Sequence, residues 1–127
     1  MIKGFEWTSR VNAIAPYDFT ITHLDSSVLL VDAKSTTGNF AMPLHISMAE
    51  IETMATSAHE YAICRIYNIT ENSGELRIAN NMRFYAKELK QAFENLPFGA
   101  RVDSISCDPT KLDFGETETL FFYDEDE

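Results

Sequence analysis

Two aspartates and a lysine stand where two neighbouring strands would bring them together. Asp32 and Lys34 are separated by one residue near the end of an apolar run, so on a strand they project from the same face about 7 Å apart. Asp18 lies on the preceding segment. If the turn between the two segments is centred on Asp25, Asp18 falls opposite Asp32, with the Cβ atoms about 5 Å apart. The three side chains then form one patch.

A patch of this kind predicts metal-dependent chemistry. Two adjacent carboxylates resist joint ionisation unless a cation lies between them, and hard oxygen ligands suit Mg²⁺ or Mn²⁺. Such an ion neutralises charge that develops on a scissile phosphate and activates a bound water, and Lys34 would orient that water or stabilise the transition state. The pattern therefore predicts phosphodiester hydrolysis. It depends on the register, because a one-residue slip moves Asp18 to the other face.

Strand patterns recur along the chain and must position this patch. The segment Val28–Ala33 is apolar enough for a central strand covered on both faces, and Pro43 favours an edge position for the segment around it. We expect strands at Tyr17–His23, Val28–Ala33, Phe40–Ile46, Tyr61–Ile69 and Glu75–Ala79, with weaker ones at Arg101–Ser106 and Thr119–Tyr123.

Two helices are expected between these strands. Ser47 and Glu50 have the spacing of a capping box, which predicts a helix start followed by about three turns. A second amphipathic pattern runs from Arg83 to Leu96 and ends before Pro97 and Gly99. Its predicted inward positions are Tyr85, Leu89, Ala92, Phe93 and Leu96. The fold class is therefore α/β, with a mixed α+β sheet flanked by helices.

The composition is that of one soluble globular domain. The chain has 127 residues, of which 45% are apolar and 24% charged. No apolar run approaches the roughly 20 residues of a membrane-spanning helix, and no secretory signal is evident. We expect one domain over residues 1–123 in the cytoplasm, with Cys64 and Cys107 as reduced thiols and no zinc site.

The formal charge of −10 argues against a free-standing nucleic-acid binder. Seven of the 20 acidic residues lie between Asp113 and Glu127, where there is no Lys or Arg, so the body of the domain is only mildly acidic. The closing residues 124–127 are predicted to form an acidic, disordered tail.

Four sequence blocks occur in the order of a known family: PYDFTI, VDAKSTTG, ISMAE and YAICRIYN. Together they resemble the Protein NO VEIN C-terminal-like domain, within the restriction-endonuclease-like PD-(D/E)xK nuclease superfamily, from about Trp7 to Asn68. The resemblance implies a restriction-endonuclease-like core. It also implies that Asp18 and Asp32 are the metal-binding acids, that Ala33 is a further metal-binding position, and that Lys34 is the catalytic lysine.

The same resemblance implies a DNA endonuclease domain in a restriction or phage-defence system. Such domains accompany helicase, ATPase or methyltransferase modules, in the same chain or as partners, and superfamily enzymes that cut both strands often form homodimers. Many superfamily members place an acid ahead of the first motif, whereas the segment Asn12–Ala15 has none and only Glu6 lies upstream. This leaves three alternatives: a site with fewer acids, a chain that is part of something larger, or lost activity.

Further residues have a structural as well as a functional interpretation. Glu50 would either reach the metal or act only as a helix cap, and its position favours the cap. Arg65 would clamp a phosphate or form an ion pair across the sheet. His23, His45 and His59 share no spacing that indicates a site. The nucleic-acid-facing candidates are Arg83, Lys87 and Lys90, on one side of the second helix.

Two other classes of function remain open from the sequence. One is a catalytically inactive module that keeps the nuclease fold and binds DNA or a partner protein. The other is an acidic inhibitor that imitates DNA, which the concentration of negative charge near the C-terminus makes the least favoured.

Overall fold

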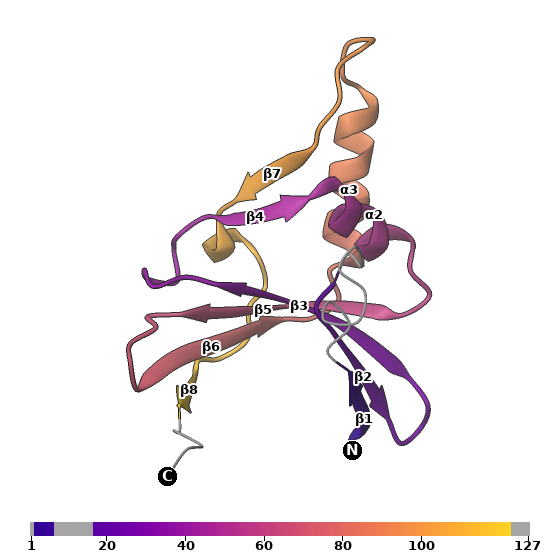
Figure 1. Ribbon diagram of the computed structural model, residues 1–127. Coiled ribbons are helices and arrows are strands. Elements are labelled where there is room, and N and C mark those ends of the chain that lie inside the picture. The colour runs from indigo at the N-terminus through magenta and orange to yellow at the C-terminus, as the bar shows by residue number, and fades with distance from the viewer. Residues whose placement is uncertain (1, 7–16, 123–127) are drawn as a thin grey trace.

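The computed structural model describes residues 2–6 and 17–122, which form a mixed α/β fold (Figure 1). A six-stranded sheet has the order β1-β2-β3-β5-β6-β8, and a two-stranded sheet pairs β4 with β7. The strands are β1 (Ile2–Glu6), β2 (Phe19–His23), β3 (Val28–Ser35), β4 (Leu44–Ser47), β5 (Glu60–Tyr67), β6 (Ser73–Ala79), β7 (Ser104–Cys107) and β8 (Glu118–Phe121). The helices are α2 (Met48–Thr56), α3 (Arg83–Glu94) and a 3₁₀ turn, η1 (Pro109–Lys111).

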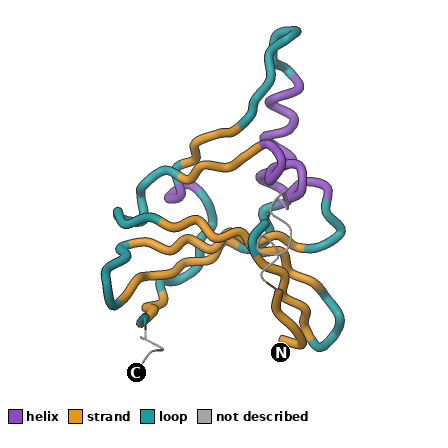
Figure 2. The backbone as a smooth tube through the Cα atoms, in the orientation of Figure 1, coloured by secondary structure: helices purple, strands orange, loops and turns teal. Residues whose placement is uncertain are grey.

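A crossover connection lies at the centre of the large sheet. Strands β3 and β5 are parallel neighbours, and β4 and α2 form the segment that joins them. All other pairs in the large sheet are antiparallel. Helices α2 and α3 and the β4–β7 pair all lie on the same side of the six-stranded sheet (Figure 2). This arrangement confirms the predicted mixed sheet, with α2 and α3 on one face.

The N-terminus of α2 is fixed by the predicted capping box. The Ser47 side chain accepts a hydrogen bond from the Glu50 N–H at 3.1 Å, and the Glu50 carboxylate accepts one from the Ser47 N–H at 2.8 Å. Both bonds satisfy main-chain donors that the first helical turn leaves without an internal partner. Because Ser47 also ends β4, the strand and the helix meet at a defined point.

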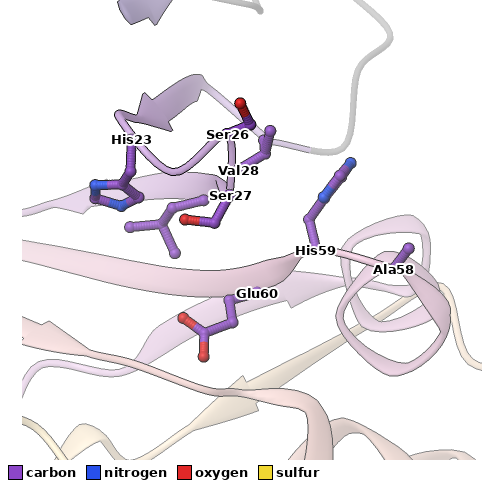
Figure 3. Close-up of a pocket in the computed structure, with 8 residues that line it drawn as sticks. His23, Ser26, Ser27, Val28, Ala58, His59 and Glu60 are labelled. Carbon is purple, nitrogen blue, oxygen red and sulfur yellow. The ribbon is translucent and has the colours of Figure 1, made fainter. Parts of the chain in front are cut away.

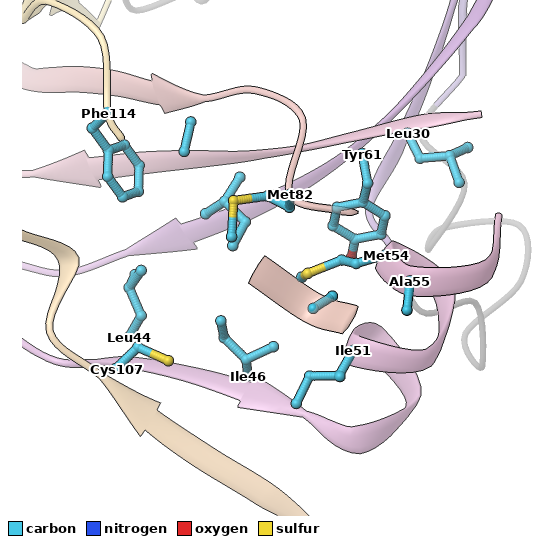
Figure 4. Close-up of a cluster of buried hydrophobic side chains, with 13 residues drawn as sticks. Leu30, Leu44, Ile46, Ile51, Met54, Ala55, Tyr61, Met82, Cys107 and Phe114 are labelled. Atoms are coloured by element: carbon cyan, nitrogen blue, oxygen red, sulfur yellow. The ribbon is translucent and has the colours of Figure 1, made fainter. Parts of the chain in front are cut away.

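The core lies between the large sheet and the layer of α2, α3 and β4 (Figure 4). Leu44 and Ile46 point inward from β4, and the side chains of Ile51 and Met54 do so from α2, with 0–1% of their surface exposed. Tyr61 and Ile63 meet them from β5. In β3 the buried residues alternate at Leu30 and Asp32, so the strand presents a charged residue to the same side as the core.

Several boundaries differ from the sequence prediction. Strand β1 was not expected. Strand β4 begins only after Pro43, because residues before it turn back, with the Met42 N–H bonded to the Asn39 carbonyl at 3.2 Å. The second face of β3 is only half-buried among the described residues, and Ala92 and Leu96 are exposed rather than inward. The other three predicted residues of helix α3, Tyr85, Leu89 and Phe93, do pack against the core, together with the fully buried Ala86.

The two cysteines, the helix lengths and the chain ends can also be compared with the sequence analysis. Cys64 and Cys107 are both free thiols. No helix among the described residues is long and apolar enough to cross a membrane. The proposed tail at residues 124–127, and the segment Asn12–Ala15, lie outside the described residues.

Candidate active site

The predicted hairpin register is present in the structure. Strands β2 and β3 pair Phe19 with Val31 and Thr22 with Val28, the alignment that the turn at Asp25 predicts. The turn is held by the Asp25 carboxylate, which accepts hydrogen bonds from the Ser27 N–H at 2.9 Å and the Ser27 hydroxyl at 2.6 Å. One position beyond the last pair, Asp18 and Asp32 are brought to the same end of the hairpin.

Asp18 lies just beyond the last residue pair between β2 and β3, and it still bonds to β3. Its N–H donates to the Val31 carbonyl at 2.9 Å, and its Oδ2 accepts the Ala33 N–H at 2.8 Å. The carboxylate is thereby fixed beside the Ala33 main chain. In an extended strand the N–H and the carbonyl of one residue face the same neighbour, so the Ala33 carbonyl is expected on the Asp18 side.

Asp32 and Lys34 share the core-facing side of β3, as their spacing predicts. Asp32 is 4% exposed, and its Oδ2 lies 2.8 Å from Lys34 Nζ. This contact is an ion pair that is not aligned as a hydrogen bond, and Asp32 Oδ2 has no hydrogen-bond partner among the described residues. The Lys34 ammonium at this distance offsets part of the cost of burying the carboxylate.

Glu50 joins this pair from the first turn of α2. Lys34 Nζ donates to Glu50 Oε1 at 3.0 Å and to Oε2 at 2.8 Å. The same carboxylate closes the capping box. The two interpretations of Glu50, as a cap and as a site residue, are therefore compatible, because one carboxylate has enough acceptor positions for both.

The buried acids and the lysine shift one another's proton affinities. Burial raises the pKa of Asp32 to about 8, the neighbouring Glu50 carboxyl group acts in the same direction, and the Lys34 ammonium opposes both. For Glu50, burial acts to raise the pKa, but the contacts with Asp32, Lys34 and the Ser47 N–H outweigh it and lower the pKa. Lys34 keeps its proton, because the two acids raise its pKa against the effect of burial.

The oxygen atoms at this end of the hairpin can be compared with the ligands that metal ions prefer. No three side chains of metal-binding type come together within the described ranges. Mg²⁺ commonly binds one or two carboxylates and keeps several waters, whereas structural zinc takes four His or Cys ligands. The Asp18 carboxylate, Asp32 Oδ2 and the Ala33 carbonyl are hard oxygen donors of the kind Mg²⁺ takes.

Arg65 lies next to Lys34 on the parallel neighbour β5. It is 2% exposed, and its Nη2 donates to the Met42 carbonyl at 2.6 Å. The ion pair across the sheet that its sequence context suggested is not formed with any acid in the described part of the chain.

The predicted nucleic-acid-facing residues of α3 are partly engaged in internal contacts. Arg83 Nη2 donates to the Ser57 carbonyl at 2.6 Å, and Lys90 pairs with Glu52 of α2 at 3.0 Å. Lys87 is exposed. Their role in binding nucleic acid stays a prediction.

A separate cavity of about 430 Å³ lies at the opposite end of β3 (Figure 3). Both His23 and His59 line this cavity, although their positions in the sequence give no reason to group them. Glu60 also lines it. The His45 side chain lies elsewhere, exposed on β4.

Comparison with known families gives a match over much of the chain. The family described as Protein NO VEIN, C-terminal, matches residues 2–79, more than half of the chain. The chain belongs to this family. No curated protein and no solved structure matched it.

The Protein NO VEIN C-terminal match runs from β1 to the end of β6. It therefore contains Asp18, Asp32, Lys34, Glu50 and Arg65. Helix α3 and strands β7 and β8 lie beyond it, and so do the three candidate cations of α3. The residues that form the buried charged cluster belong to the part of the chain that defines the family.

Proposed function

We propose that this chain is a metal-dependent endonuclease domain that hydrolyses phosphodiester bonds in DNA. The observation that carries the proposal is the buried cluster of Asp32, Lys34 and Glu50, with Asp18 fixed at the end of the same hairpin. Buried charges cost stability, and an apolar substitute is often neutral or stabilising. A cluster of three, with shifted pKa values, is therefore a candidate functional site.

Each side chain has a role that its position supports. Asp18, Asp32 and the Ala33 carbonyl would hold a Mg²⁺ or Mn²⁺ ion, which supplies charge neutralisation at the scissile phosphate and activation of a bound water. The Lys34 ammonium contacts Asp32, and 19% of the Lys34 side chain is exposed to solvent. It would therefore donate to a phosphate oxygen or orient the water. Glu50 holds Lys34 in place.

The biological setting follows from the proposed function. A partner module of the helicase, ATPase or methyltransferase kind, in the same chain or as a separate protein, would supply DNA affinity that a chain of charge −10 lacks. Restriction or phage defence is the setting that we propose, and a homodimer would provide the second active site for a double-strand cut.

A plasmid-cleavage assay tests the proposal. Wild type, Asp32→Asn and Lys34→Met are compared on supercoiled DNA with Mg²⁺ or Mn²⁺. We expect each variant to lose about 10²-fold or more, as on removal of one transition-state donor. Lys111→Met is the matched control, since it removes an exposed lysine of η1 that has no part in the proposed site and should cleave like wild type. Equal cleavage by all four proteins would refute the assignment.

The second candidate is a catalytically inactive DNA-binding or protein-interaction module. The observation that favours it is that Lys34 is already paired with two acids, as a purely structural lysine would be. Calorimetric titration with Mn²⁺ separates the two. No metal uptake by the wild type, together with measurable binding of DNA or a partner, supports the inactive module.

A further inference from the structure

A second cavity of about 350 Å³ borders the candidate active site. It lies between the ends of β3 and β5 and the segment that leads into β4. Lys34 belongs to both the cavity wall and the buried cluster. The remaining polar wall is formed by Arg65, Ser35, Thr36 and His45, and none of the Asp or Glu residues that the structure describes lines it.

Arg65 is an incompletely compensated buried cation in this wall. Its Nη2 donates to the Met42 carbonyl at 2.6 Å, its Nη1 lies 3.5 Å from the Lys34 carbonyl, and its Nε is buried with no hydrogen-bond partner among the described residues. Burial lowers the pKa of Arg65, but an arginine does not lose its proton in a protein. A full positive charge therefore lies beside the cavity with only main-chain carbonyls to balance it.

The sheet places further positive charge beside Arg65. Its direct neighbours are Lys34 on β3 and Arg77 on β6, so three cationic residues follow one another across the strands. Arg77 is occupied, because it stacks on Phe40 at 4.2 Å and donates to the Gly115 carbonyl at 2.7 Å. Lys34 is paired with its acids. Of these three cations, Arg65 is the one that the described residues pair with neither a carboxylate nor an aromatic ring, so its charge is available to a ligand.

We propose that this cavity binds a phosphate group of the nucleic-acid strand, next to the phosphodiester held at the Asp18 and Asp32 end. An anion there is met by Arg65 and by the hydroxyl and imidazole groups of the wall, and it would balance the buried guanidinium. The assignment of the phosphate to a substrate strand rests on the proposed function. The binding of phosphate itself does not, because it needs neither metal nor catalysis.

Nuclear magnetic resonance in the presence of EDTA tests the proposal without cleavage. The isotope-labelled full chain is titrated with inorganic phosphate and, separately, with a short single-stranded DNA oligonucleotide. We expect saturable shifts of the amide signals of Ser35, Thr36 and His45 with both probes. Shifts with phosphate but not with the oligonucleotide would overturn the assignment to a nucleic-acid strand, and no shift with either would overturn the site.

Three variants identify the cation responsible. Arg65→Met should weaken binding of both probes about tenfold or more, the loss expected for a charge-assisted hydrogen bond. Arg101→Met removes one positive charge from an exposed position and should bind like wild type. If Arg65→Met does not fold, His45→Glu decides, since it introduces a carboxylate on the exposed side of β4 and should abolish binding. Unchanged binding by a folded Arg65→Met or by His45→Glu would overturn the proposal.

The outcomes separate the two proposals. If phosphate binds as expected but no variant of the plasmid assay shows metal-dependent cleavage, the cavity stands and the nuclease proposal fails. If the wild type cleaves and Arg65→Met binds and cleaves equally well, the nuclease proposal stands and the cavity assignment fails.

Discussion

At the residue scale, Asp32 combines burial with a required charge. Its pKa of about 8, against 3.8 for an ordinary aspartate, means that the folded protein holds this carboxyl group protonated at pH values where the unfolded chain releases the proton. Between these two values the unfolded state binds fewer protons than the native state, so this group makes the free energy of unfolding fall as the pH rises. Stability and the proposed metal binding therefore place opposite demands on the charge of Asp32.

This opposition gives a prediction for Asp32→Asn. The amide resembles the protonated carboxyl in shape and cannot ionise, so it does not lose stability through ionisation as the pH rises, and we expect the variant to be more stable than wild type near pH 8 by at least about 1 kcal/mol. The difference should shrink as the pH falls through 3.8 and level off below about pH 3, where Asp32 is protonated in both states. Urea unfolding across this pH range measures it, and an equal or lower stability of the variant at pH 8 would contradict the sign.

At the element scale, the junction of β4 and α2 joins helix capping to the site. Glu50 accepts the Ser47 N–H and two hydrogen bonds from Lys34, so one side chain fixes both the start of α2 and the position of the ammonium. The helix start thereby determines where the lysine of another strand lies. Two substitutions separate these effects.

Ser47→Ala and Glu50→Gln should give opposite results. Ser47→Ala removes the side-chain cap and should cost about 1 kcal/mol of stability while cleavage stays close to wild type. Glu50→Gln retains an acceptor for the capping box but removes the charge that holds Lys34, so cleavage should fall about 10- to 100-fold, as for other groups that orient site residues. Chemical denaturation and the plasmid assay together check this. The reverse pattern would assign Glu50 to capping alone.

At the scale of the whole molecule, the net charge bears on the proposed affinity for nucleic acid. The excess of ten negative charges opposes DNA binding, and Arg83 and Lys90 are engaged within the fold. Any local attraction at Lys34 and Arg65 therefore works against a repulsive background. Salt screens the repulsion that arises from the net negative charge, whereas it screens a contact made inside a cavity much less.

Removing residues 124–127 tests how much the net negative charge weakens DNA binding. The deletion takes away four acidic residues, so we expect the affinity for a short DNA duplex to rise at low salt and the gain to diminish as salt is added. Fluorescence anisotropy in EDTA at several salt concentrations measures both. An unchanged affinity at low salt would show that these charges do not act on DNA binding.

Local sequence signals predicted the parts of this protein that depend on neighbouring residues. The turn at Asp25 fixes the register of β2 and β3, strand alternation puts Asp32 and Lys34 on one face, and the capping box fixes the start of α2. Each depends on hydrogen bonds or geometry within a few residues or one hairpin. The family match over residues 2–79 agrees with the sequence blocks that suggested it.

Only the tertiary structure decided which distant groups meet. The contact between Lys34 and Glu50 requires the β4–α2 crossover to pack on the sheet, and the place of Arg65 beside Lys34 requires the parallel register of β3 and β5. The high pKa of Asp32 follows from burial by the same packing. Such contacts join residues far apart in the chain, and no local spacing encodes them. The sequence by itself determined which residues are candidates for the chemistry, and the fold decided their charge states and the cavity beside them.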